Sequence, residues 1–126
     1  MMTGVVTDQF EAVVTLTVLG SGQTESCDAV IDTGFTDWLT LPPSMVNDLE
    51  LRRISSGKVA LADGSSRIFE IYQADILWSG RKQRVQIYEC DTTPLIGMRL
   101  MKGCRLTMDI ETQDKVEIVP LEHSSP

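Results

Sequence analysis

The feature that most constrains the fold of this chain is a series of short segments in which apolar and polar residues alternate. In residues 10–19, FEAVVTLTVL, valine and leucine occupy one face and threonine the other. Residues 104–110, CRLTMDI, repeat the alternation. A period of two is typical of a half-buried β-strand. The pattern therefore predicts an all-β chain.

Other segments are rich in β-forming residues and are separated by turn signals such as GSG and Asp63-Gly64. They cover residues 27–31, 38–41, 58–62, 65–78, 84–90 and 116–119. With the two segments above, this gives about eight strands. Short strands at this spacing predict a small closed β-barrel.

Two segments favour short helices, and one favours a loop. Pro42 and Pro43 open residues 44–51, SMVNDLEL, and proline is favoured at a helix start. A second short helix is expected around residues 98–102, closed by Gly103, and residues 52–57 are expected to form a loop. We expect one domain over residues 1–126, with a core from about 10 to 119 and a tail from 120 to 126.

Composition excludes several classes of function. The net charge is −7, so we expect no nucleic-acid partner and no binding to an anionic membrane. Arg52-Arg53 and Arg81-Lys82 are interpreted as loop charges, and Trp38 and Trp78 as core or interface aromatics. No segment reaches the roughly 18 apolar residues of a membrane span, and we expect no secretory leader.

The cysteine and histidine content points away from metal, redox and histidine-dependent chemistry. Cys27, Cys90 and Cys104 form no CxxC pair, and an odd, sparse set favours a reducing cytoplasm. The single histidine, His123, lies in the tail, so a histidine-activated nucleophile is not expected. We expect no metal, no cofactor and a cytoplasmic location.

The stretch AVIDTGFTDWL, residues 29–39, places a carboxylate where an apolar strand ends. Burying Asp32 costs free energy unless hydrogen bonds satisfy it. Gly34 allows a tight turn with close backbone N–H groups, and the Thr33 hydroxyl can bond to a neighbouring segment. The tripeptide alone is weak evidence, because an Asp-Thr-Gly turn can cap a strand without any chemistry.

A pair of such carboxylates would have a chemical use. Two carboxylates that face each other across a two-fold axis share a proton, because like charges at short distance resist joint ionisation. The ionised member can take a proton from a water while the protonated member polarises a substrate carbonyl. Such a dyad hydrolyses a peptide bond without a metal, a histidine or a covalent intermediate.

Several motifs in order strengthen this interpretation. WLTLP follows the aspartate, a hairpin with the tip ALADGSS comes about thirty residues later, and PLIG at 94–97 comes about sixty residues later. Over residues 10–119 the chain resembles the retropepsin-type aspartic proteases, in the single-domain bacterial branch related to retroviral proteases. The resemblance implies a small β-barrel that is active as a homodimer on an extended peptide or protein substrate.

By position, the resemblance implies a role for each motif. Asp32 would be the catalytic aspartate, Thr33 would lock the two active-site loops together, and Gly34 would allow the turn. The tip of the flap that closes over the substrate would be Ala62, Asp63, Gly64 and Ser65. The element beneath the catalytic loop would be Leu95, Ile96 and Gly97, followed by the family's single helix.

Two residues depart from the family pattern or add to it. Family members usually carry alanine or serine after the glycine, whereas this chain carries Phe35, whose ring can reshape the substrate groove or the dimer contact. Asp37 adds a further negative charge nearby.

The sequence supports an aspartic endopeptidase and leaves two alternatives open. One is a dimerisation or peptide-binding module that has the retropepsin fold but does not cleave peptides. Phe35, which departs from the family pattern, is the reason for this alternative. The other is a plain β-barrel domain, which predicts a monomer. For the peptidase we expect apolar side chains around the scissile bond and the greatest activity at mildly acidic pH.

Overall fold

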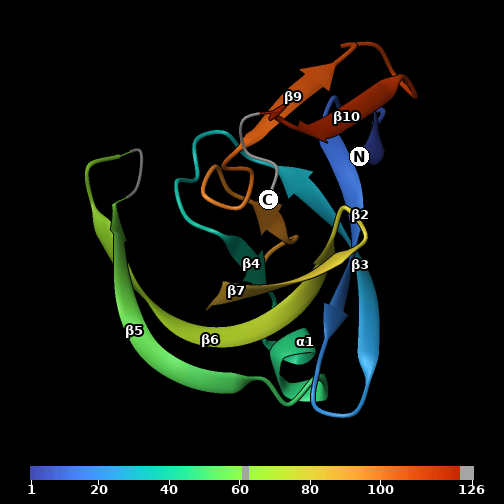
Figure 1. The fold of residues 1–126 in the computed structure, drawn as a ribbon. Helices are drawn as coiled ribbons and strands as arrows, with labels where there is room; N and C mark the ends of the chain where they lie inside the picture. The colour runs from blue at the N-terminus through green and yellow to red at the C-terminus, as the bar shows by residue number, and fades with distance from the viewer. Residues whose placement is uncertain (61–62, 123–126) are drawn as a thin grey trace.

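A computed structural model of the chain describes residues 1–60 and 63–122, and within these residues the fold is almost entirely β (Figure 1). The predicted all-β class is confirmed. The described elements are β1 (Met2–Val6), β2 (Ala12–Leu19), β3 (Thr24–Ile31), β4 (Leu39–Leu41), α1 (Pro43–Asp48), β5 (Arg52–Ala60), β6 (Ser66–Trp78), β7 (Arg81–Glu89), β8 (Leu95–Ile96), β9 (Cys104–Met108) and β10 (Lys115–Pro120).

The strands form one sheet that folds back on itself. Its order is β5-β6-β7-β4-β8-β3-β2-β1-β10-β9, and an additional antiparallel pairing joins β2 to β6. In that pairing Val18 lies opposite Ile76, and both side chains are fully buried. The pairings from β6 through β7, β4, β8 and β3 to β2 therefore run in a ring around the main core.

The shortest strand, β8, occupies the position that matters most for the site. It pairs in parallel with β3, with Val30 opposite Leu95 and Ile31 opposite Ile96, and antiparallel with β4 through Leu39. Ile96 is fully buried. The end of β3, which leads directly into Asp32, is therefore fixed from the side by β8.

The main core explains why strand residues alternate. Along β2 the buried side chains are Val14, Leu16 and Val18, as the period-two pattern predicts. Helix α1 begins with Pro43 after Pro42, and its buried residues Met45 and Val46 join the same core. None of the helices in the described part of the chain is long and apolar enough to cross a membrane.

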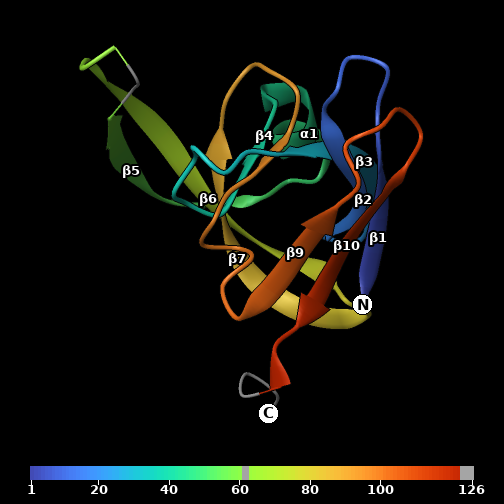
Figure 2. The same ribbon diagram turned by 90° about the horizontal axis from the view of Figure 1, so that it is seen from above.

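Strands β5 and β6 extend beyond the ring as a long curved arm, drawn in green at the left of Figure 1. Their register runs from Arg52 opposite Gln73 to Ala60 opposite Ser66. At the other end of the sheet, β9 and β10 form a hairpin beside β1 (Figure 2). Strand β9 ends the sheet order, so one of its edges is left unpaired by the described strands.

Four sequence predictions need correction. Ten strands are described rather than about eight, because β1 and the two-residue strand β8 were not among the predicted strands. Residues 52–57 are part of β5 and not a loop. No helix forms at 98–102, where the described backbone makes successive turns that include a Lys102 N–H to Arg99 C=O bond of 3.3 Å. Strand β1 precedes the predicted core at residue 10, yet it pairs with both β2 and β10.

Adjacent residues on β6 test the placement of the core. Ile76→Ala is expected to lower the free energy of unfolding by about 3 kcal/mol, because Ile76 is fully buried where β6 meets β2. Leu77→Ala, at a side chain that is 39% exposed, is expected to cost below about 1 kcal/mol. Chemical denaturation of both variants measures the difference, and equal losses would contradict this packing.

Candidate active site

Asp32 follows the last residue of β3 and is held by backbone hydrogen bonds on both sides. Its N–H donates to the carbonyl of Ile96 at 2.9 Å, and its carbonyl accepts from the N–H of Phe35 at 3.1 Å. Its carboxylate oxygen Oδ1 accepts from the N–H of Gly34 at 2.9 Å. The tight Asp-Thr-Gly turn thus satisfies one carboxylate oxygen, and Asp32 stays partly exposed.

The segment from Leu95 to Gly97 lies against the loop that follows Asp32. The Gly97 N–H donates to the carbonyl of Trp38 at 2.8 Å. A Cβ at Gly97 would lie 2.1 Å from the Asp37 carbonyl oxygen and 2.7 Å from the Phe35 ring, so only glycine fits this contact. The structure therefore brings the predicted support element and the Asp-Thr-Gly loop together.

A buried hydroxyl in β4 forms a further hydrogen bond to β8. Thr40, in β4, is 4% exposed, and its Oγ1 accepts a hydrogen bond of 2.9 Å from the Leu95 N–H. This bond satisfies a backbone donor at the start of β8 that would otherwise lack a strand partner. The position of β8, and with it that of Asp32, depends on a polar side chain inside the sheet.

The negative charge of Asp37 is partly compensated by the neighbouring side chain of Arg99. One of its carboxylate oxygens lies 3.7 Å from Nε of Arg99, and its backbone carbonyl accepts from the Arg99 N–H at 3.2 Å. Burial, together with the negative charge of Asp37, raises the pKa of the Tyr88 hydroxyl. The loop after Asp32 is thus connected to β7 and to the turn after β8.

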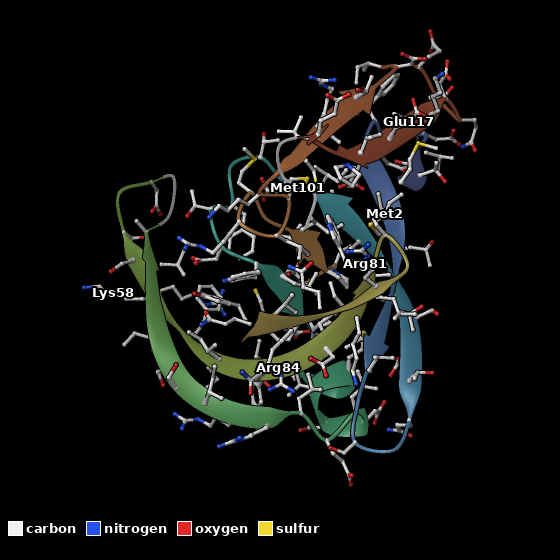
Figure 3. All side chains as sticks on the ribbon, in the orientation of Figure 1. Met2, Lys58, Arg81, Arg84, Met101 and Glu117 are labelled. Atoms are coloured by element: carbon white, nitrogen blue, oxygen red, sulfur yellow. The ribbon has the colours of Figure 1, made fainter. Side chains whose placement is uncertain are left out.

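A pocket of about 620 Å³ opens between the Asp-Thr-Gly loop and the inner face of the arm. Asp32 and Gly34 line one wall, and Val59, Arg67 and Phe69 of the arm line the other. Lys58 also borders it, but its side chain points away from the molecule (Figure 3). The volume is in the range of small-ligand and side-chain binding sites.

The apolar wall of this pocket is a separate aromatic cluster. Phe69, Ile71 and Tyr88 are buried together, and Phe35 packs against them. The Phe35 and Tyr88 rings meet edge to face with centroids 6.0 Å apart, and the Arg67 guanidinium lies 5.1 Å from the centre of the Phe69 ring. Phe35 therefore belongs to the wall, and the pocket remains open with its ring in place.

The hairpin tip is only partly described. Ala62, one of the four predicted flap residues, lies outside the described residues, and His123 of the tail does too. Asp63 accepts hydrogen bonds from the Ser65 hydroxyl at 2.5 Å and the Ser65 N–H at 2.9 Å, which lower the pKa of Asp63. Gly64 has a φ of +87°, a conformation that glycine adopts readily.

Thr33 points to a different surface from Asp32. It is exposed, and it lines a pocket of about 270 Å³ with Phe10, Met108 and Ile110, whereas Asp32 lines the pocket under the arm. Phe10 is 60% exposed and Ile110 is 65% exposed. The two neighbours Asp32 and Thr33 thus face a pocket and an apolar surface respectively.

Comparison with known proteins gives no match: neither a protein-family model nor a curated protein resembles this chain closely enough to identify it. Within the described residues, no group of three or more histidine, cysteine, aspartate or glutamate side chains could hold a metal ion.

Sequence reasoning missed several residues of the pocket. Tyr88, Phe69 and Arg67 were read only as strand residues, because alternation shows which face a side chain takes but not what lies opposite. The spacing of Arg67, Phe69 and Ile71 on one face of β6 was the available signal. Asp37 was expected to add negative charge near Asp32. In the structure it forms an ion pair with Arg99, and its charge raises the pKa of Tyr88.

Gly97 provides a test of how the site is held. Gly97→Ala is expected to lower the free energy of unfolding by at least about 2 kcal/mol, because its Cβ would overlap the Asp37 carbonyl. In Gly34→Ala the Cβ would meet only the Asp32 Oδ1 at 3.3 Å, so a loss below about 1 kcal/mol is expected. Urea denaturation compares the two, and a harmless Gly97→Ala would show that the loops are not in close contact.

Proposed function

We propose that this protein is an aspartic endopeptidase of the retropepsin type, with a barrel formed by the ring of strand pairings. The observation that supports the proposal most strongly is the position of Asp32 and the hydrogen bonds that hold it. A carboxylate at the end of an apolar strand is fixed by Ile96 and Gly34, remains partly exposed, and lines a pocket large enough for a side chain.

The pocket also indicates the type of substrate. The aromatic cluster of Phe35, Phe69 and Tyr88 offers an apolar surface beside Asp32. An extended peptide lying between the loop and the arm would place alternate side chains toward and away from this surface. Apolar residues next to the scissile bond are therefore the expected preference.

The reaction requires a second carboxylate, and a second copy of the chain would supply it. Exposed Thr33 adjoins the apolar side chains of Phe10 and Ile110, and the free edge of β9 lies in the same part of the sheet. Exposed apolar groups next to an unpaired strand edge favour association. In the proposed homodimer the two Thr33 residues meet near the axis, and the two Asp32 carboxylates form the dyad.

In this dimer the dyad holds one proton and one water. The ionised Asp32 takes a proton from the water, whose oxygen attacks the peptide carbonyl, while the protonated Asp32 of the other chain donates its proton to the carbonyl oxygen. The protonated aspartate then gives its proton to the amine nitrogen while the ionised one takes a proton from a hydroxyl of the tetrahedral intermediate, so the C–N bond breaks, the amine leaves and a carboxylic acid forms. The arms, with Asp63 and Ser65 at their tips, would cover the substrate.

Asp32→Asn tests the chemistry directly. The variant keeps the shape of the side chain but cannot take up the proton, so cleavage of a mixed peptide library is expected to fall by at least about a thousandfold. Wild-type activity is expected to be greatest at mildly acidic pH and to decline as the shared proton is lost. The rates are measured by mass spectrometry of products.

Two outcomes would contradict the proposal. One is a rate that rises steadily to about pH 9, since a dyad that needs a shared proton does not behave so. The other is peptide binding without cleavage at any pH by a dimeric protein, which would favour the peptide-binding module instead.

Substitution of apolar residues by aspartate tests the proposed dimer face. Phe10→Asp with Ile110→Asp is expected to raise the dimer dissociation constant by at least about tenfold, because two carboxylates would be placed in an apolar contact. Ile68→Asp is the matched control, since Ile68 is 71% exposed on the arm. Analytical ultracentrifugation measures the constants, and an unchanged dimer in the double variant would place the interface elsewhere.

A further inference from the structure

A second pocket, distinct from the one at Asp32, gathers both tryptophans of the chain and several cations. Its volume is about 580 Å³. Trp38 and Trp78 line it together with Arg81, Arg99, Lys102 and Gln83. Since the chain has two tryptophans in total, both indoles report on this one place. No aspartate or glutamate of the described residues lines it.

Strand geometry directs Arg81 toward this pocket. Arg81 lies opposite Trp78 in the β6–β7 ladder, and Gln83 lies opposite Ile76, so these four side chains share one face of the sheet. Ile76 and Trp78 are buried on that face. Arg81 is labelled at the end of this hairpin in Figure 3. Lys82 also borders the pocket, although its Nζ lies 3.8 Å from Asp75, with which it forms an ion pair.

The cations of the pocket are poorly neutralised. Within residues 1–60 and 63–122, Arg81 and Lys102 make no ion pair. Arg99 contacts Asp37 at 3.7 Å through Nε, which leaves its other guanidinium donors available. Like charges gathered without counter-charges repel one another, and a bound anion would remove this cost. Such a gathering is notable in a chain of net charge −7.

The wall also contains an unused polar group. Ser79 has a buried hydroxyl oxygen for which the described residues provide no hydrogen-bond partner. Its φ of +52°, followed by +78° at Gly80, is the turn conformation for which asparagine or glycine is preferred over serine. Ser79 therefore adopts this conformation at some cost in free energy, and it is one of the residues that line the pocket.

From these observations we propose that this pocket binds a small anionic ligand with a flat apolar body, such as an aromatic phosphate or carboxylate. Guanidinium groups bind both kinds of anion in pairs of hydrogen bonds, and the indoles offer a surface for the ring. The volume suits a ligand of this size. The site uses none of the Asp-Thr-Gly residues, so it stands independently of the proposed peptidase activity.

Intrinsic tryptophan fluorescence of the full chain tests the site. The probes are AMP as an aromatic phosphate and phthalate as an aromatic carboxylate. Adenosine is the uncharged comparison, and inorganic phosphate is the comparison without a ring. At least one aromatic anion is expected to change the fluorescence saturably, with adenosine and phosphate binding at least about tenfold more weakly. Comparison of AMP with phthalate distinguishes a phosphate ligand from a carboxylate ligand.

Charge variants show where the probe binds. Arg81→Gln with Lys102→Gln is expected to weaken binding by at least about tenfold. Arg105→Gln with Lys115→Gln removes the same charge from exposed positions outside the pocket and is expected to leave the binding constant within about twofold. Thermal unfolding of each variant checks that the fold is retained. If the pocket pair unfolds, Lys102→Gln alone is compared with Lys115→Gln.

Three outcomes would overturn the proposal. One is no saturable change with either aromatic anion at millimolar concentration. Another is equal weakening by both variant pairs, which would show general charge attraction. The third is binding of inorganic phosphate as tight as that of AMP together with no effect of the pocket variants.

Discussion

The site depends on the backbone contact between β3 and β8. Two residues of β8 fill the gap between β3 and β4, and the bond from the Asp32 N–H to the Ile96 carbonyl fixes the residue that carries the carboxylate. Such a short strand has few bonds of its own, so it needs support from outside. Thr40 provides one hydrogen bond, and Gly97 permits the close approach of the next loop. The carboxylate is therefore positioned by the sheet and not by a flexible loop.

The backbone contact between β3 and β8 also determines the electrostatics of the loop after Asp32. The loop carries two carboxylates, and the structure gives them different partners. Asp32 accepts a hydrogen bond from the backbone of its own turn, whereas Asp37 forms an ion pair with Arg99. A charge that is already paired contributes little field at its neighbour. The loop can therefore contain both residues while Asp32 alone is left available to a ligand or a second chain.

The sequence predicted the fold class and the segments that meet at the site, but not the side chains that complete it. Alternation located β2 and β9, because a strand with one buried face must show it, and a long run of β-forming residues located β6. Strand β5 was misread at residues 52–57, where all but Gly57 are exposed and no apolar face is present. The turns at 98–102 were predicted as a helix because the apolar residues Leu100 and Met101 suit a short helix, whereas the structure buries them in successive turns. The Phe35–Tyr88 contact joins residues far apart in the chain, and no local pattern records it.

The two pockets differ in the charged residues that line them, and one ion pair lies between the pockets. Asp37 lines the pocket under the arm, Arg99 lines the pocket with the tryptophans, and the pair spans the loop between them. Besides Asp37, the pocket under the arm is lined by Asp32, Arg67 and Lys58, whereas the pocket with the tryptophans is lined by cations, with no aspartate or glutamate of the described residues. Arg99 contacts Asp37 through Nε at 3.7 Å, so its other guanidinium donors remain available to the pocket with the tryptophans. One loop thereby separates a carboxylate site from a cationic site in a small domain.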